Sequence, residues 1–279
     1  MPLLRRLDHS IHYEEYGPPT APPLLLIMGL GLSAQAWDRL PARLAERFRV
    51  VVFDNRGIGK SGRPGGRYRL HDFADDAAAV LQAVLGGSDG GAAKSPAGGP
   101  GGAHVFGISM GGMIAQELVL RHPQLVRSLV LGATFASWRH SDKPALRVSL
   151  TLLAINLVGP RAAHRLASFL VSPEFAAAHP QEFPRWLRRA DLGERSSVLR
   201  QLRAIAGHST LQRLGRVTAP TLVVTGSADL LVPPANSRVL QAQIPGARLV
   251  ELPGAGHLFP LEREDETVRL LSAHFLLQA

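Results

Sequence analysis

The sequence lacks several features that would assign a protein to a broad class. There is no cysteine in its 279 residues, which excludes disulfide bonds, catalysis by a thiolate and cysteine-ligated metal sites. The longest apolar run, 148–158, is interrupted by polar residues and is far shorter than the roughly 20 residues of a membrane-spanning helix. No apolar stretch with a small-residue cleavage site begins the chain, so we expect a cytoplasmic protein.

Acidic residues are also in the minority, with 22 Asp and Glu against 31 Lys and Arg, a formal net charge of +9. Such an excess raises nucleic acid and anionic membranes as partners. The basic residues are scattered over 5–6, 63–69, 185–189 and 195–203, without interleaved aromatic residues or a nucleic-acid motif. We therefore expect neither a nucleic acid nor a membrane as partner. The oligomeric state stays open.

The composition, 46% hydrophobic and 19% charged, is that of a soluble globular protein with one large domain or a core with one inserted subdomain. Short apolar runs bounded by Gly and Pro predict strands at 24–28, 50–53, 105–106, 129–131, 221–225 and 248–252. Amphipathic patterns predict helices at 37–48, 73–85 and 264–277. Strands that alternate with helices predict an α/β fold with a parallel sheet covered on both faces.

The predicted sheet is interrupted between 135 and 217. This segment has no convincing strand but has helical stretches at 145–157, 161–170, 184–190 and 197–206. We call residues 135–217 the cap segment and expect a core of 1–134 and 218–279 with a helical cap of 135–217 inserted into it. A Gly-rich stretch, 86–102, has the composition of a flexible surface loop, and we assign it no catalytic role.

The pattern Gly107-Ile108-Ser109-Met110-Gly111 follows a predicted strand and precedes a helical pattern. A sharp strand-to-helix turn lifts a serine hydroxyl above the strand ends, and small residues on either side keep neighbouring atoms clear. The following helix directs its N-terminal amides at developing negative charge. The alternative is an ordinary glycine-rich turn, so the pattern needs partners elsewhere in the chain.

A serine hydroxyl needs a base that takes its proton and a third group that orients the base. Asp229 follows the predicted strand 221–225, and His257 follows 248–252, so both lie at strand ends, where open α/β sheets place their sites. Taken alone, Asp229 could be a helix N-cap and His257 a surface histidine. Because the chain order is Ser, Asp, His, the three together predict a catalytic triad.

Acyl transfer also needs donors for the oxyanion of the tetrahedral intermediate. We expect the backbone amides of Met110 and Leu30, the second in the glycine-containing loop after the first apolar strand, although that loop could simply end the strand. Trp138 and Phe259 are expected to contact substrate, and His208 is expected to have a capping or surface role. Further aromatic and apolar residues could line an apolar pocket or only pack in the core: Phe135, Leu152, Leu153 and Trp186. No metal site is indicated.

These residues resemble the α/β-hydrolase fold superfamily from about Ile11 to the final helix. The segment 53–61 is similar to the family's turn after its next parallel strand, 219–226 to the strand before the acid, and 254–257 to the histidine loop. The resemblance implies a mostly parallel, usually eight-stranded sheet, a helical cap after the sixth strand, a Ser-His-Asp triad and no cofactor. Many members begin the oxyanion loop with His-Gly, whereas this chain has Met28-Gly29.

The serine at the elbow argues against the family's haloalkane dehalogenases and epoxide hydrolases, whose nucleophile is a carboxylate. We therefore expect a serine hydrolase, with a carboxylesterase-like activity on a small carboxylic ester. Lactonase, enol-lactonase and thioesterase activities are alternatives on the same triad, as are carbon–carbon bond hydrolysis and perhydrolysis. A different class of protein, a non-catalytic binder of small ligands on this fold, is the remaining alternative.

Overall fold

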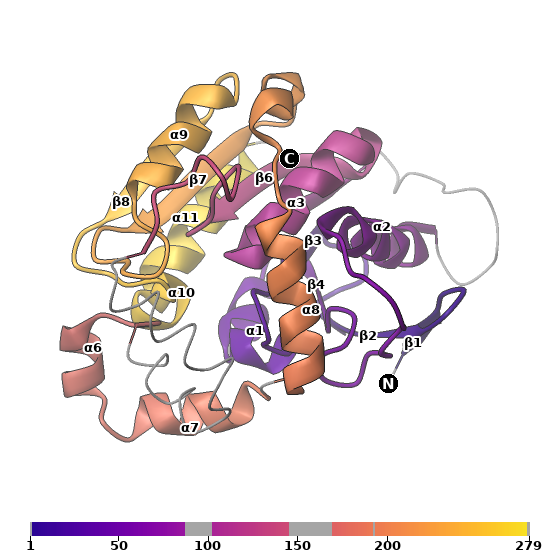
Figure 1. Cartoon of the computed structure of the whole chain (residues 1–279), viewed down its shortest axis with the longest axis horizontal. Helices are drawn as coiled ribbons and strands as arrows, with labels where there is room; N and C mark the ends of the chain where they lie inside the picture. The colour runs from indigo at the N-terminus through magenta and orange to yellow at the C-terminus, as the bar shows by residue number, and fades with distance from the viewer. Residues whose placement is uncertain (1, 87–101, 145–168, 192, 278–279) are drawn as a thin grey trace.

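A computed structural model describes residues 2–86, 102–144, 169–191 and 193–277 (Figure 1). A sheet of eight strands lies at the centre, in the order β1-β2-β4-β3-β5-β6-β7-β8. Strands β1 and β2 join it in antiparallel fashion, and the other neighbours pair in parallel. The expected α/β-hydrolase architecture with a mostly parallel sheet is confirmed. The strands are β1 (Leu3–Arg5), β2 (Ser10–Tyr16), β3 (Pro23–Ile27), β4 (Arg49–Phe53), β5 (Ala103–Ile108), β6 (Val126–Gly132), β7 (Thr221–Gly226) and β8 (Arg248–Leu252).

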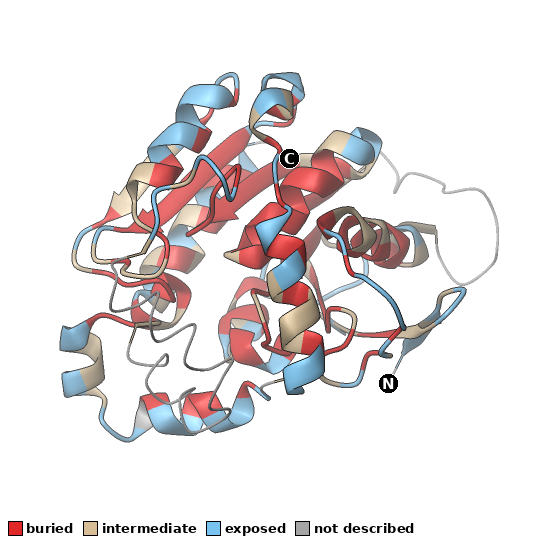
Figure 2. Cartoon of the chain, viewed as in Figure 1, coloured by how far each residue is buried: buried red, intermediate tan, exposed pale blue. Residues whose placement is uncertain are grey.

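Helices cover both faces of the sheet because alternate strand residues point to opposite sides. In β3, Leu25 and Ile27 pack on one face with α2 (Leu70–Gly86), α3 (Met110–Arg121) and α9 (Ala235–Gln243). Leu24 and Leu26 pack on the other face with α1 (Leu40–Leu44) and α11 (Glu264–Leu276). Figure 2 shows the result: the central strands β4, β3, β5, β6 and β7 are almost entirely buried, and exposed residues lie on the outer sides of the helices and in the peripheral strands β1, β2 and β8.

The helix expected at 37–48 is wrong in its extent. The chain forms a short 3-10 helix, η1 (Ala34–Trp37), and then the separate helix α1. Asp38 interrupts the run with a left-handed backbone, φ 51°, and Pro41 lies in the first turn of α1, where the missing amide costs nothing. The periodic apolar residues Leu40 and Leu44 are buried nonetheless, so the pattern identified the buried face but not the break.

The chain leaves the sheet after β6 and returns to it at β7. Between them lie α6 (Pro173–Ala178), α7 (Glu182–Arg189), α8 (Arg195–Ala206) and the 3-10 helix η3 (Leu211–Arg216). The outgoing and returning stems form a bridge at Ser137 and Ser209, flanked by a bond from the Trp138 amide to the His208 carbonyl, 3.0 Å. The helices expected at 145–157 and 161–170 fall almost wholly on residues outside the described ranges, as do Leu152, Leu153 and most of the Gly-rich stretch.

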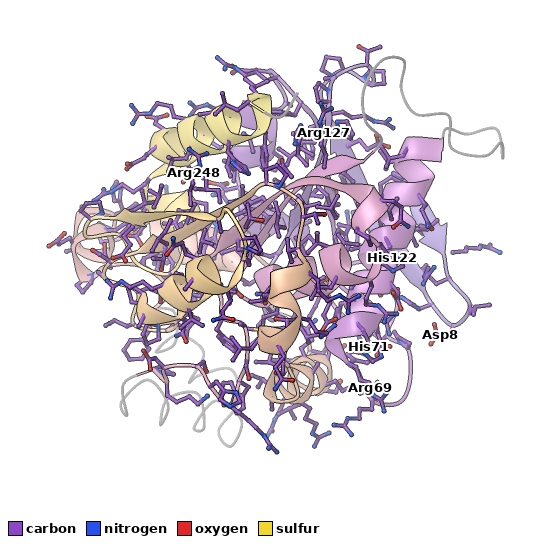
Figure 3. The ribbon with its side chains drawn as sticks, turned by 90° about the horizontal axis from the view of Figure 1, so that it is seen from above. Asp8, Arg69, His71, His122, Arg127 and Arg248 are labelled. Carbon is purple, nitrogen blue, oxygen red and sulfur yellow. The ribbon has the colours of Figure 1, made fainter. Side chains whose placement is uncertain are left out.

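The remaining described elements are the 3-10 helix η2 (Pro123–Leu125) and α10 (Phe259–Glu262). In the part of the chain that the structure describes, every helix is too short or too polar to cross a bilayer. Basic residues are placed on separate sides of the molecule: in Figure 3, Arg127 and Arg248 lie on the side of α11, and Arg69 and His71 on the opposite side.

Candidate active site

Ser109 forms the turn between β5 and α3 and has a left-handed backbone, with φ 57° and ψ −122°. A residue other than glycine reaches this region only at a cost of about 1–3 kcal/mol, so the surroundings must hold it there. Two hydrogen bonds do so: the Ser109 amide donates to the Gly132 carbonyl at 2.9 Å, and the Thr134 hydroxyl donates to the Ser109 carbonyl at 2.7 Å. The strain is that of a nucleophile elbow.

The two glycines of the motif are required by close packing of the backbone. A Cβ at Gly107 would lie 2.2 Å from the Gly111 carbonyl oxygen, and one at Gly111 would lie 2.0 Å from the Ile27 carbonyl oxygen. Both distances are far below any van der Waals contact. The motif therefore has a steric explanation in which β3, β5 and the start of α3 meet beneath the serine.

Asp229 and His257 come from the loops after β7 and β8 and are both buried, with 4% and 2% of their surfaces exposed. The Nδ1 atom of His257 lies 2.8 Å from Oδ2 of Asp229. The other carboxylate oxygen accepts hydrogen bonds from the amides of Leu231 and Val232, each at 2.8 Å. The main chain thus orients the carboxylate, and the carboxylate orients the imidazole.

The loop that carries His257 is fixed by a second carboxylate, that of Glu262. Its Oε1 accepts from the Gly256 amide at 2.9 Å and from the Ser172 amide at 3.0 Å, and its Oε2 accepts from the Ser172 hydroxyl at 2.6 Å. The amide of Leu258 donates to the Leu170 carbonyl at 2.7 Å. Leu258, on one side of His257, is therefore bonded to the cap segment directly, and Gly256, on the other side, is joined to it through Glu262.

The two expected oxyanion donors lie on either side of the serine. Met110 is the first residue of α3, so its amide has no partner inside that helix. Leu30 follows Gly29, where a Cβ would lie 3.1 Å from the Cβ of Ser109, so this loop passes directly beside Ser109. Among the described residues, neither the Leu30 nor the Met110 amide donates a hydrogen bond, and both are available to an anion.

Ser109, His257 and Leu30 line one cavity of about 170 Å³. Its walls are almost entirely apolar. They come from the oxyanion loop, the elbow, the outgoing stem of the cap segment, α8 and the two loops that hold the acid and the base. The main apolar contributors are Met28, Leu32, Ile108, Met113, Phe135, Trp138, Leu170, Leu202, Ile205, Leu231, Val232 and Leu258, and Ser141, Asp142, Lys143 and Pro144 complete the lining.

Trp138 lies in this cavity as expected, but two other aromatic residues do not. Phe259, expected to contact substrate, is 1% exposed and packs in the core, with its ring centroid 6.4 Å from that of Phe106. The correction has a simple cause: Leu258 faces the cavity, and α10 turns the next side chain away from it. Trp186 donates from its indole nitrogen to the Ala36 carbonyl at 3.0 Å and stacks on Phe183 outside the cavity.

His208 lies behind the cavity wall rather than on the surface. It is 4% exposed, its ring centroid is 6.0 Å from that of Phe135, and its Nε2 lies 3.2 Å from the Phe135 carbonyl oxygen. Burial lowers the pKa of His208 to about 4, so the ring is neutral at physiological pH. A metal needs at least three gathered ligands, and within the described ranges no such group of His, Asp or Glu occurs.

Comparison with known proteins gives consistent matches. The model of the alpha/beta hydrolase family matches residues 24–270. A protein of Azorhizobium caulinodans named as a candidate carbamate hydrolase, RutD, is 29% identical over 93% of this chain and 92% of its own length. Among solved structures, a hydrolase from Pseudomonas aeruginosa has 26% identity and a TM-score of 0.82, covering 98% of this chain and 97% of its own. An enol-lactonase from Burkholderia xenovorans, 23% identical, has a TM-score of 0.82 over 99% and 100%, a likeness in fold alone.

Proposed function

The chain belongs to the alpha/beta hydrolase family and is a hydrolase, and on that premise we propose that it cleaves a small carboxylic ester through Ser109, His257 and Asp229. One observation carries the proposal. The strained serine and the carboxylate-bound histidine, which are far apart in sequence, line the same small apolar cavity. A buried serine of ordinary structural role would need neither the strained turn nor the oriented imidazole beside it.

In the proposed mechanism, Oγ of Ser109 attacks the ester carbonyl while Nε2 of His257 accepts its proton. Asp229 holds the imidazole through Nδ1 and stabilises the imidazolium that forms. The amides of Leu30 and Met110 donate to the oxyanion of the tetrahedral intermediate. His257 then protonates the leaving alkoxide, and an acyl-enzyme forms. Water attacks the acyl group with His257 as base, which releases the carboxylic acid and regenerates Ser109.

The cavity supports a small, apolar substrate. Its volume of about 170 Å³ is below the range of about 300–1,000 Å³ found for pockets that enclose drug-sized ligands. Phe135 and Trp138 would contact the acyl or alcohol group. We keep the other expectations as parts of the proposal: a cytoplasmic enzyme with core 1–134 and 218–279, a cap of 135–217, and a small molecule rather than a nucleic acid or membrane as partner.

Carbamates are a second candidate class, because several relatives at 28–31% identity are named as candidate carbamate hydrolases. Ser109 would attack the carbamate carbonyl and expel the alcohol or amine, and water would then hydrolyse the carbamoyl-enzyme and regenerate the serine. Hydrolysis of a lactone or a thioester would need the same nucleophile, base and oxyanion donors. A panel of esters, lactones, thioesters and carbamates with acyl groups of increasing size would rank these classes by kcat/KM.

The test of the proposal is the rate of p-nitrophenyl acetate and butyrate hydrolysis by the wild-type protein and by Ser109→Ala. We expect a loss of at least about 10³-fold, as when other triad members are removed. Ser141→Ala is the matched control, because Ser141 lines the same cavity but its hydroxyl donates to the Trp138 carbonyl. It should retain activity within a few fold. Equal rates for wild type and Ser109→Ala would reject the mechanism and favour a non-catalytic binder.

A further inference from the structure

The oxyanion loop, residues 28–33, is held by a side chain of the cap segment. We propose that Gln201, on α8, is a positioning residue that orients the Leu30 amide toward the oxyanion. The inference rests on the proposed function, in which Leu30 is one of the two donors. It adds a role for the cap segment beyond covering the cavity: one donor would be in place only while α8 is docked.

Gln201 is completely buried, and both ends of its amide contact the main chain of the core. Its Oε1 accepts a hydrogen bond from the Gly31 amide at 2.9 Å. Its Nε2 donates to the Arg56 carbonyl at 3.4 Å, in the turn after β4. Burying a primary amide is costly unless its polar atoms are bonded, so this side chain has one favourable arrangement.

These bonds fix the peptide units on either side of the proposed donor. The Leu30 N–H belongs to the peptide unit between Gly29 and Leu30. The preceding unit is held by Asn55, whose Nδ2 donates to the Met28 carbonyl at 3.0 Å. The following unit is held by Gln201 through the Gly31 amide. The donor therefore lies between two anchored peptide planes, one anchored by the core and the other by the cap segment.

Other contacts show that α8 is docked on this loop. The Gly193 amide, just before α8, donates to the Gly31 carbonyl at 2.8 Å. A Cβ at Gly31 would lie 3.3 Å from Val198, which is three residues before Gln201 and on the same side of the helix. Gly31 itself has φ +71°, a backbone that glycine adopts without strain. Because glycine adopts positive and negative φ about equally readily, the bond from its amide to Gln201 restricts the conformation of Gly31.

The matched control for Gln201 is Gln116, a second fully buried glutamine. It donates to the Phe135 carbonyl at 3.1 Å and accepts from the Thr210 hydroxyl, so it joins α3 to both stems of the cap segment. Gln201→Leu and Gln116→Leu remove the same amide from equally buried sites. Only the first removes a bond to the oxyanion loop. Gln201→Glu keeps an acceptor for the Gly31 amide and serves as the conservative variant.

For Gln201→Leu we expect kcat for p-nitrophenyl acetate to fall by about 10-fold or more, part of the 10²–10³-fold lost when an oxyanion donor is removed. KM should change by less than about threefold. An alkylboronic acid forms a tetrahedral adduct with Ser109 that places an oxygen in the oxyanion site. Its Kd should therefore rise in parallel with the loss of kcat/KM. Inhibition by acetate should stay unchanged. Gln201→Glu should recover most of kcat.

Amide hydrogen exchange of residues 28–33 tests the same inference without any turnover. Exchange of these amides should be faster than in wild type in Gln201→Leu and near the wild-type rate in Gln116→Leu. The proteins are compared under conditions in which the same fraction of molecules is folded. Unchanged exchange in Gln201→Leu, or an equal loss of kcat in the two leucine variants, would overturn the inference. If wild type and Ser109→Ala show no difference in ester turnover, the proposed function fails, and the exchange rates alone decide whether Gln201 holds the loop.

Discussion

Asp229 and His257 are joined by a 2.8 Å hydrogen bond, and the carboxylate is oriented by two main-chain amides before it meets the imidazole. In Asp229→Asn, the side-chain oxygen can still accept from these amides, but the NH₂ group would face the imidazole and stabilise the wrong tautomer. We expect kcat for p-nitrophenyl acetate to fall by about 10³–10⁴-fold with little change in Tm.

The control for this change is Asp142→Asn, since Asp142 lines the same cavity but, among the described residues, is not bonded to His257. It should keep kcat within a few fold. A loss smaller than about 10-fold in Asp229→Asn would mean that Asp229 does not set the tautomer of His257.

The close packing around Gly107 and Gly111 predicts that a larger residue at either position impairs folding. Gly111→Ala would place a methyl group 2.0 Å from the Ile27 carbonyl oxygen, in backbone that cannot shift without moving β3. We expect either no soluble protein or a Tm lower by about 2–12 °C, since overpacking in a tight site costs about 1–3 kcal/mol and occasionally more. Gly65→Ala, where nothing lies within 4 Å of the new methyl group, should leave the Tm unchanged. Similar melting curves for the two variants would contradict the steric explanation.

Removing the Glu262 carboxylate should destabilise the protein more than removing a surface carboxylate. Glu262→Ala leaves the buried amides of Gly256 and Ser172 without an acceptor, and we expect the free energy of unfolding to fall by about 2–4 kcal/mol. Glu264→Ala, which removes partly exposed ion pairs to Arg39 and Arg43, should cost less than about 1 kcal/mol. Urea unfolding measures both. Equal losses would show that the bonds of Glu262 add little.

Three buried histidines predict loss of stability in acid. Burial lowers the pKa of His104 and of His208 to about 4, and burial together with the Arg248 guanidinium lowers the pKa of His274. Arg127, whose charge disfavours protonation of His104, and Arg248, whose charge disfavours protonation of His274, lie on the same side of the molecule (Figure 3). The folded state therefore holds these rings neutral, whereas the unfolded chain protonates near pH 6.5.

The sign of the effect follows from these lowered values. The stability that depends on the neutral histidines is fully present above about pH 6.5. It is lost as the pH falls toward about 4, because only the unfolded state gains protons between these two values. His104→Gln should reduce the drop in unfolding free energy between pH 7.5 and 5 by roughly 1–2 kcal/mol. An identical pH dependence of urea unfolding in wild type and His104→Gln would refute the assignment.

The sequence predicted the extent of a strand best where the apolar run was four or five residues long, whereas the runs 105–106 and 129–131 cover only part of β5 and β6. Strands β3, β4, β7 and β8 begin and end within about two residues of the expected ranges. The antiparallel strands β1 and β2 did not appear among the predicted runs, because β2 contains the half-buried Glu14 and the exposed Glu15. A strand at or next to the edge of the sheet, with one wet face, carries a weaker pattern than a strand buried on both faces.

The three chemical groups of the site were predictable because each combines a reactive residue with a turn after a strand. The cavity walls were not. Leu202 and Ile205 share one side of α8, but a helical pattern alone cannot tell a cavity wall from the core. Glu262 and Gln201 carried no sequence signal, because a polar residue looks the same in the sequence whether it is exposed or bonded to a buried amide.

The bridge between Ser137 and Ser209 brings the exit from the sheet and the return to it to a single point. Residues 138–208 can therefore be cut out as one cassette and replaced by the corresponding piece of another hydrolase without rerouting β6 or β7. A graft of this kind would keep Ser109, Asp229 and His257 but would lose the bonds of Leu170 and Ser172 that hold the loop of His257. It would have to bring its own replacement for the glutamine that reaches Gly31.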